Sequence, residues 1–183
     1  MRKVMSSLFY TLDGVVEAPN RWQFGFDDDM GAALARLLDQ QDAALLGRTT
    51  YSEWVEYWPT AADEPFASWI NRVPKYVAST TLDSVDRWPN STLIKGSLVD
   101  FVTDLRSQDG GAIGVWGSPT LVRTLFEHGL VDELQLQIHP VVGGGRLRRL
   151  FADDSMLAKL ELIESEQTSG GVIIANYRQV PDR

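Results

Sequence analysis

The chain has 183 residues, of which 44% are hydrophobic and 23% are charged. This composition is ordinary for a globular protein, and the length predicts one domain over residues 1–183 with a core of its own. The formal net charge of −8 argues against a broad nucleic-acid-binding surface, which requires clustered Lys and Arg. One small anionic ligand is still compatible with it, because local cations can differ in sign from the total.

Cysteine is absent, which excludes disulfides, thiolate metal sites and cysteine nucleophiles. The two histidines, His128 and His139, are too few for a three-histidine metal site. The N-terminal segment MRKVMSSLFYTLDG lacks the apolar core of a signal peptide, and no stretch approaches the roughly 18 apolar residues of a membrane span. We therefore expect a cytoplasmic protein without a metal ion or a membrane-spanning segment.

Hydrophobic periodicity divides the chain into alternating strands and helices. The first strand is expected over residues 3–12, followed by a turn at Asp13–Gly14 and a loop that reaches Phe26. Further strands are expected over residues 43–47, 75–80, 91–95, 111–117, 133–142, 159–167 and 172–180. Helices are expected over residues 28–41, 49–58, 65–73, 97–107 and 119–128.

The order of these elements predicts the architecture. Strands and helices alternate until about residue 140, and a hairpin of two antiparallel strands closes the chain. Parallel strands joined by helices form sheets that are covered on both faces. The expected fold is therefore α/β, with a mixed, mostly parallel sheet and an antiparallel C-terminal hairpin.

Capping residues predict where two helices begin. Asp27 or Asp28 is expected to cap the first helix. Thr50 and Glu53 have the spacing of a capping box, which would use one of the free backbone N–H groups of the second helix.

The segment Gly47-Arg48-Thr49-Thr50 follows a buried strand and opens a helix. In sheets of this kind, ligands bind outside the carboxyl ends of the strands, and a helix N-terminus with an adjacent arginine favours phosphate. The alternative is an ordinary capped helix with a surface arginine.

The segment VWGSPTLV repeats this pattern, since a strand ends at Gly117 and Ser118 precedes a helix that begins with Pro119. The glycine would let a ligand approach the backbone closely. A well-capped helix explains the same residues without a ligand.

The segment VASTTLD places Ser79, Thr80 and Thr81 at a third strand end, where they could bind a ribose 2′-phosphate. Such clusters are also common in simple turns. The G-x-G-x-x-G fingerprint of the usual dinucleotide fold is absent. Two phosphate-binding segments in one α/β domain nevertheless favour a dinucleotide.

These stretches together resemble the dihydrofolate reductase-like family, and in particular its branch related to the C-terminal reductase domain of bifunctional, RibD-type riboflavin-biosynthesis proteins. The resemblance covers nearly the whole chain. It is carried by the segments TLDGVV, ALLGRTTYSEW, VASTT, VWGSPTLVRTLFEHGLVDELQLQIHPVVGGG and RLF. It implies a three-layer fold, bound NADPH and a homodimer.

By motif position, the resemblance also implies which residues bind NADPH. They are Gly47, Arg48, Thr49, Thr50, Ser79, Thr80, Trp116, Gly117, Ser118, Pro119 and Thr120. Dihydrofolate reductases have a cis Gly–Gly peptide in the last of these segments. The corresponding pair here is Trp116–Gly117, and a cis bond that does not precede proline costs about 3 kcal/mol.

The resemblance places the substrate beside the first strand. The candidate substrate-binding residues are Ser7, Phe9, Val16 and Trp22, the last as a cover from the following loop. Dihydrofolate reductases bind the pterin through an acidic residue on the first helix, which makes Asp28 and Asp29 the catalytic candidates. Acidic residues at a helix N-terminus also serve as caps and stabilise the helix dipole, which is the alternative.

The expected activity is hydride transfer from NADPH to a small heterocycle. The best substrate guess by resemblance is 5-amino-6-(5-phosphoribosylamino)uracil, with dihydrofolate or a pteridine as the second. A nucleotide-binding protein without turnover and a reductase that uses a flavin are alternatives. The zinc-binding deaminase domain of the bifunctional proteins is absent from these residues. No clear basic cluster marks a site for a second phosphate: Arg146, Arg148 and Arg149 are the candidates, and the alternative is that they are solvated surface residues.

Overall fold

The computed structural model describes residues 1–151 and 157–180, which form an eight-stranded sheet with helices on both faces. The strands are β1 (Val4–Thr11), β2 (Gln41–Gly47), β3 (Lys75–Ala78), β4 (Ser91–Leu93), β5 (Ala112–Val115), β6 (Glu133–His139), β7 (Leu160–Gln167) and β8 (Ile173–Gln179). The α-helices are α1 (Asp28–Gln40), α2 (Arg48–Trp54), α3 (Phe66–Arg72), α4 (Leu98–Ser107) and α5 (Pro119–Glu127). Two 3-10 turns, η1 (Pro19–Arg21) and η2 (Trp58–Thr60), lie in the loops.

The strand order is β4-β3-β2-β5-β1-β6-β8-β7. Every pair from β4 to β6 is parallel, whereas β8 is antiparallel to both β6 and β7. This confirms the predicted mostly parallel sheet with an antiparallel C-terminal hairpin. The parallel strands end at one edge of the sheet, so the segments that follow them come together there.

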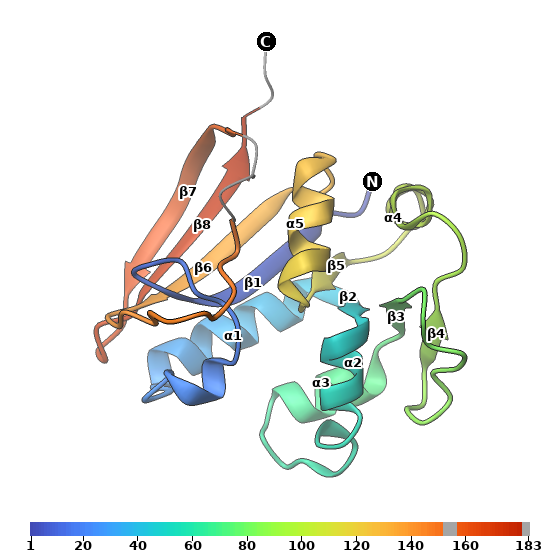
Figure 1. Cartoon of the computed structure of the whole chain (residues 1–183), viewed down its shortest axis with the longest axis horizontal. Coiled ribbons are helices and arrows are strands. Elements are labelled where there is room, and N and C mark those ends of the chain that lie inside the picture. The colour runs from blue at the N-terminus through green and yellow to red at the C-terminus, as the bar shows by residue number, and fades with distance from the viewer. Residues whose placement is uncertain (152–156, 181–183) are drawn as a thin grey trace.

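The helices form the outer layers of a three-layer fold. In Figure 1, α4 and α5 cover one face of the sheet, and α1 lies across the opposite face. The apolar side chains of α2 and α3 pack on the α1 side in a separate aromatic-rich cluster. The predicted dihydrofolate reductase-like arrangement is therefore confirmed.

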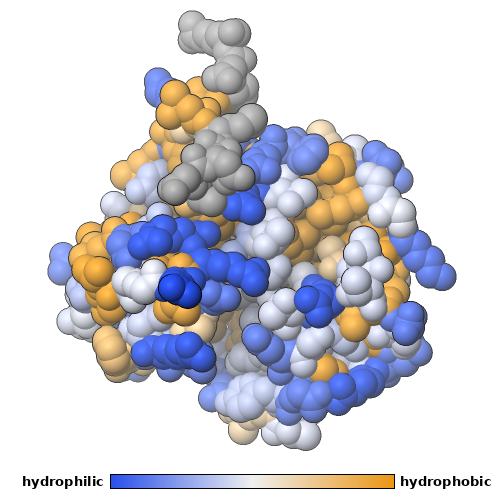
Figure 2. Space-filling model, viewed as in Figure 1, coloured by the Kyte–Doolittle hydropathy of each residue, from blue (hydrophilic) through white to orange (hydrophobic). Residues whose placement is uncertain are grey.

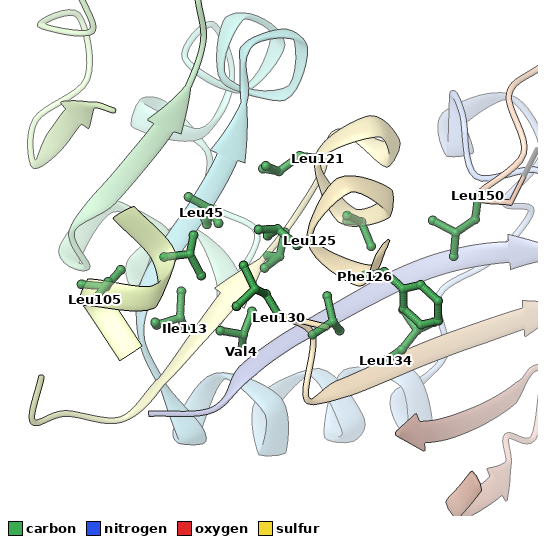
Figure 3. Close-up of a cluster of buried hydrophobic side chains, with 14 of the residues drawn as sticks. Val4, Leu45, Leu105, Ile113, Leu121, Leu125, Phe126, Leu130, Leu134 and Leu150 are labelled. Carbon is green, nitrogen blue, oxygen red and sulfur yellow. The ribbon is translucent and has the colours of Figure 1, made fainter. Parts of the chain in front are cut away.

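The larger core cluster lies under α5. This helix presents Leu121, Leu125 and Phe126 to apolar residues of the central strands, including Ile113 and Leu134 (Figure 3). Burial of a side chain of this size contributes about 1.5–3 kcal/mol. The packing fixes the start of α5 against the ends of β2 and β5.

The helix starts confirm one prediction and correct another. Asp27 caps α1, since its carboxylate accepts the backbone N–H of Met30. The predicted capping box of Thr50 and Glu53 is wrong, because α2 already begins at Arg48 and has no side-chain cap. The Thr50 hydroxyl instead faces the neighbouring loop at Gly117. The helix is also shorter than predicted and ends at Trp54.

Candidate functional site

A groove of about 430 Å³ opens at the edge of the sheet where β2 and β3 end and α5 begins. It is lined by Gly47, Arg48, Thr49, Ala78, Ser79, Thr80, Thr81, Ile94, Gly96, Leu98, Ser118, Thr120, Leu121, Thr124 and Arg148. Hydroxyl groups and cations line one part of the groove, and aliphatic side chains line another. Figure 2 shows hydrophobic surface between the positions of α5 and α4.

The segments after β2 and β5 touch each other at the bottom of this region. The backbone N–H of Gly47 donates to the carbonyl of Gly117 at 2.7 Å. A Cβ atom at position 47 would lie 2.7 Å from Ser118 Oγ and 2.9 Å from its backbone nitrogen. Position 47 therefore requires glycine because of this close approach, and its backbone conformation is an ordinary extended one.

The peptide between Gly117 and Ser118 is cis. The resemblance predicts the pair that corresponds to the cis Gly–Gly peptide at Trp116–Gly117. This prediction is wrong by one residue, because the cis bond follows Gly117. The Trp116 side chain packs instead against Phe66 and Trp69, with ring centroids 4.8 and 5.5 Å away. This predicted cofactor-binding residue therefore directs its side chain into the core.

Two arginines line the groove and favour an anionic ligand despite the net charge of the chain. Arg48 is exposed at the start of α2. Arg148 reaches the groove from the loop after β6, and its Nε lies 3.5 Å from a carboxylate oxygen of Glu17. The backbone N–H of Arg148 donates to the same carboxylate at 2.9 Å, which fixes the loop beside the groove. The sequence placed Arg148 at a second phosphate, and the structure places it at this groove.

Ser79 is positioned by a turn at the end of β3. Its Oγ accepts the backbone N–H groups of Thr81 at 3.1 Å and Leu82 at 3.0 Å. Because the oxygen lone pairs are used in this way, the hydroxyl proton can be donated to a ligand oxygen. The turn explains the serine structurally and also leaves it able to bind phosphate.

The predicted cofactor residues divide into two groups. Those that line the groove are Gly47, Arg48, Thr49, Ser79, Thr80, Ser118 and Thr120. Those that do not line it are Thr50, Trp116, Gly117 and Pro119. The sequence did not identify the aliphatic wall of Ile94, Leu98 and Leu121, because isolated apolar residues carry no signal of ligand binding.

The predicted substrate residues lie on the opposite side of the sheet, with one exception. Ser7 and Phe9 project from β1 toward α1, and Phe9 packs against Met30. Trp22 is buried above β6, and its indole N–H donates to the carbonyl of Glu17 at 2.8 Å. Val16 belongs to the core cluster under α5, so it does not join the other candidates.

The acidic candidates Asp28 and Asp29 are exposed at the start of α1. Asp29 accepts the backbone N–H of Ser169 in the β7–β8 turn at 2.7 Å, a structural contact. Asp27, their neighbour, has a lowered pKa because it accepts the N–H of Met30 and other hydrogen bonds. In residues 1–151 and 157–180, no cluster of three or more acidic or histidine side chains could hold a metal ion.

A polar row on β6 faces α1, and its two glutamines were not among the predicted site residues. It consists of Gln135, Gln137 and His139, all buried. Ser7 donates to Gln135 at 2.8 Å, and Gln137 donates to Ser7 at 3.2 Å. The alternation of polar and apolar residues along this strand was visible, but it is typical of a half-buried strand.

A second groove of about 360 Å³ lies beside the C-terminal half of α1, next to Met5, Glu133 and the β7–β8 hairpin. None of the predicted site residues lines it. No helix among the residues that the structure describes is long and apolar enough to cross a membrane.

Comparison with known proteins gives the same fold. A structure described as a putative riboflavin biosynthesis protein from Shewanella sp. PV-4 matches with a TM-score of 0.79 at 20% identity, over 98% of this chain and 99% of that one. Dihydrofolate reductase from Enterococcus faecalis, complexed with NADP(H), matches with a TM-score of 0.65 at 11% identity, over 97% and 96%. A bifunctional deaminase/5-amino-6-(5-phosphoribosylamino)uracil reductase from Thermotoga maritima matches with a TM-score of 0.70 at 14% identity, over 98% of this chain and 57% of that one.

Two sequence comparisons identify the family. The uncharacterized protein YyaP of Bacillus subtilis (strain 168) is 32% identical over 96% of this chain and 94% of its own length. The family model of the RibD C-terminal domain matches residues 2–174, and this match supports an oxidoreductase of the riboflavin-biosynthesis type. The chain therefore belongs to the RibD C-terminal domain family.

Proposed function

We propose that the protein is an NADPH-dependent reductase that transfers hydride to a small heterocyclic substrate. The observation that carries this proposal is the groove at the ends of β2, β3 and β5, where hydroxyls, arginines and an aliphatic wall come together. A groove of this composition suits a ligand with both phosphate groups and an apolar ring. Membership of a reductase family supports the same assignment.

The residues present fit NADPH. The backbone at Ser118 and the side chains of Thr49 and Thr120 would bind the diphosphate, because α5 directs its free N–H groups and positive dipole end toward the groove. Arg48 and the Ser79 hydroxyl would bind the 2′-phosphate. The aliphatic residues Ile94, Leu98 and Leu121 would pack against the adenine.

When bound, NADPH supplies the hydride. The residues of this chain orient the reactants and exclude water. Phe9 on β1 and Trp22 in the loop that follows it both pack against His139 and would shield a bound substrate ring there from water. The hydrogen bonds that lower the pKa of Asp27 keep this carboxyl ionised near neutral pH, so it is a poor proton donor. The proton would come from solvent at the exposed start of α1, where Asp28 and Asp29 lie.

The substrate we propose is a pyrimidine of the 5-amino-6-(5-phosphoribosylamino)uracil type, with dihydrofolate or a pteridine as the second candidate. The family supports the first. Of the arginines suggested for its phosphate, Arg149 is held by Asp13, whose carbonyl accepts from Nε at 2.7 Å. Arg148 belongs to the cofactor groove, which leaves Arg146, exposed in the same loop.

Titration with NADPH and NADH, followed by nicotinamide fluorescence on tryptophan excitation, tests the proposal. We expect binding that prefers NADPH and that weakens in Arg48→Ala but not in Arg72→Ala, a control on α3. Failure to bind either nucleotide would contradict the proposal. Binding without turnover of any ribosylaminopyrimidine, dihydrofolate or pteridine would favour a nucleotide-binding protein, and a visible absorbance spectrum of the purified protein would reveal a flavin.

We also propose that residues 1–183 act as one domain in a cytoplasmic homodimer. The continuous sheet supports one domain. Leu162, Ile163 and Ile173 are each about half exposed on the C-terminal hairpin and offer an apolar contact for a second copy. Light scattering after size-exclusion chromatography would give the mass, and Ile163→Glu should shift a dimer toward the monomer.

A further inference from the structure

The α1 face of β6 differs from its other face. Gln135, Gln137 and His139 point toward α1, opposite Ser7, Phe9 and Thr11 of β1 in the sheet register. The alternate residues of β6, Leu134, Leu136 and Ile138, pack in the apolar core. A face that is covered by a helix would normally also be apolar, so the buried polar row requires an explanation.

Hydrogen bonds within the row leave two atoms without partners. Gln137 is 4% exposed and directs its Nε2 to Ser7 Oγ, while Ser7 directs its own proton to Gln135. These two hydrogen bonds orient the Gln137 carboxamide. The Oε1 atom of Gln137 is then buried without a hydrogen-bond partner among the described residues. His139 is 3% exposed, and its Nε2 is likewise buried and unpartnered there.

Such unpartnered groups destabilise a fold. Each buried polar atom without a partner costs about 1–3 kcal/mol, whereas an apolar residue of the same shape would cost nothing comparable. The two atoms belong to residues two apart on one strand, so both side chains lie on the same face. Because the two residues share one face of β6, a single ligand bound on that face would pair with both atoms.

Aromatic residues cover this place. His139 packs edge-on against Phe9 and Trp22, with ring centroids 5.5 and 5.6 Å away. Phe26 lies 6.5 Å from Phe9 and is 50% exposed, and Phe24 in the same loop is 83% exposed. The half-exposed Phe26 therefore joins solvent to the buried polar pair through Phe9, which suits a loop that opens to admit a flat ring and then covers it.

We infer that Gln137 and His139 determine substrate specificity by binding the ring-amide edge of a planar heterocycle. The inference rests on the proposed reductase function. Gln137 Oε1 accepts a ring N–H, and His139 Nε2 donates to the adjacent carbonyl oxygen. Burial lowers the pKa of His139, against the opposing charge of Asp27, and so favours the neutral imidazole. Ser7 and Gln135 position the Gln137 carboxamide, and the segment between Gly14 and Phe26 moves to let the ring enter.

The first test separates a ligand-binding role from a structural one. His139→Phe removes the unpartnered Nε2, and Gln137→Leu removes the unpartnered Oε1 together with the 3.2 Å hydrogen bond from Nε2 to Ser7. Both keep a side chain of similar shape. We expect the melting temperature of each variant to equal or exceed that of the wild type. A fall of both melting temperatures well below the wild-type value would show that the polar row stabilises the fold and would overturn the inference.

The second test measures recognition with two probes, 5,6-diaminouracil and its 1,3-dimethyl derivative, which has no ring N–H. Binding is measured by calorimetry with and without NADP⁺. We expect the wild type to prefer the unmethylated ring by about tenfold or more, as for a buried hydrogen bond, and each variant to lose most of this preference. Gln108→Leu and His128→Phe, both at exposed positions on other elements, are the matched controls and should keep the preference.

The outcomes distinguish this inference from the proposed function. If the wild type binds NADPH but does not discriminate between the two rings, or if the variants discriminate as well as the wild type, the specificity role is wrong and the reductase assignment stands. If the wild type discriminates between the rings but does not bind NADPH, the ring site is supported and the reductase assignment fails.

Discussion

The groove at the ends of β2 and β3 and the α1 face of β6 differ in how their polar groups are arranged. In the groove, the fold already holds several of the lining residues: the Gly47 N–H donates to the Gly117 carbonyl, the Ser79 hydroxyl accepts from its turn, and Glu17 contacts Arg148. On β6, Gln137 and His139 are buried, and each retains an atom without a partner. The first region can bind a charged ligand without a large rearrangement, whereas the second requires its aromatic cover to move.

This difference concerns solvation. Phosphate groups stay partly hydrated in an open groove, so a few cations and hydroxyls are sufficient to hold them. A neutral ring gains more from a dry site, where a hydrogen bond is stronger and an unpaired group is costly. We therefore expect substitutions in the groove to change affinity and salt dependence, and substitutions on β6 to change selectivity.

The largest effect is expected from Gly47→Val. The added Cβ would lie under 3 Å from Ser118 Oγ and its backbone nitrogen, so the two segments that we propose to bind phosphate would be forced apart. We expect NADPH affinity to fall by about 100-fold or more, because misplaced donors lose several charge-assisted hydrogen bonds together. Gly25→Val is the control, since nothing lies within 4 Å of a Cβ there. Equal NADPH titrations for the two variants would contradict the assigned close approach.

Arg48→Ala should have the next largest effect. A hydrogen bond to a charged group contributes about 1.5–3 kcal/mol, so NADPH affinity should fall by about tenfold to a hundredfold. Arg148→Ala should cost less, because Glu17 already competes for this guanidinium. Titrations at increasing salt should show a shallower dependence in both variants. An unchanged salt dependence would remove these arginines from the cofactor site.

The pH dependence of stability tests the buried face. Burial lowers the pKa of His139, so the folded state takes up a proton less readily than the unfolded state. Unfolding is then favoured as the pH falls below about 6.5, and one histidine changes the free energy of unfolding by at most about 1.4 kcal/mol per pH unit. Urea denaturation between pH 5 and 8 should show this loss reduced in His139→Phe and retained in His128→Phe. Equal slopes in all three proteins would indicate that folding does not lower the pKa of His139.

The smallest effect is expected from Ser79→Ala. Its hydroxyl would donate one hydrogen bond to the 2′-phosphate, and that phosphate distinguishes NADPH from NADH. The preference for NADPH should fall by about tenfold, the lower end of the range for a hydrogen bond to a charged group, because the hydroxyl donor is itself neutral. NADH affinity serves as the internal control and should stay constant, provided that the turn formed by the Thr81 and Leu82 N–H groups survives. A parallel loss for both nucleotides would indicate that the turn has collapsed.

The elements and their order could be predicted from the sequence. Local signals sufficed for Asp27 at the start of α1 and for the glycine-containing turn between β7 and β8. The prediction failed at Thr50. Its spacing to Glu53 is that of a capping box, but in the structure its hydroxyl points toward Gly117 and does not cap the helix. A capping pattern is local, and a contact with a segment nearly seventy residues away in the chain can displace it.

The candidate site could be predicted only where a motif is contiguous. Gly47 to Thr49 and Ser118 to Thr120 were found because hydroxyls and glycine at a strand end already indicate phosphate binding. Trp116 and Val16 were placed in the site by adjacency, and their side chains point into the core. Trp116 and Val16 lie outside long alternating patterns, so the sequence did not show whether their side chains would point into the groove or into the core.

The sequence by itself determined the alternation of strands and helices, and with it the edge of the sheet where the segments after β2 and β5 meet, because periodicity and capping depend on near neighbours. Only the tertiary structure decided that Gly47 must contact Ser118, that Arg148 reaches the same groove and that Gln137 and His139 are buried with unpartnered atoms. Close approach and desolvation depend on segments that are distant in the chain. Their effects become visible only when the packed sheet brings those segments together.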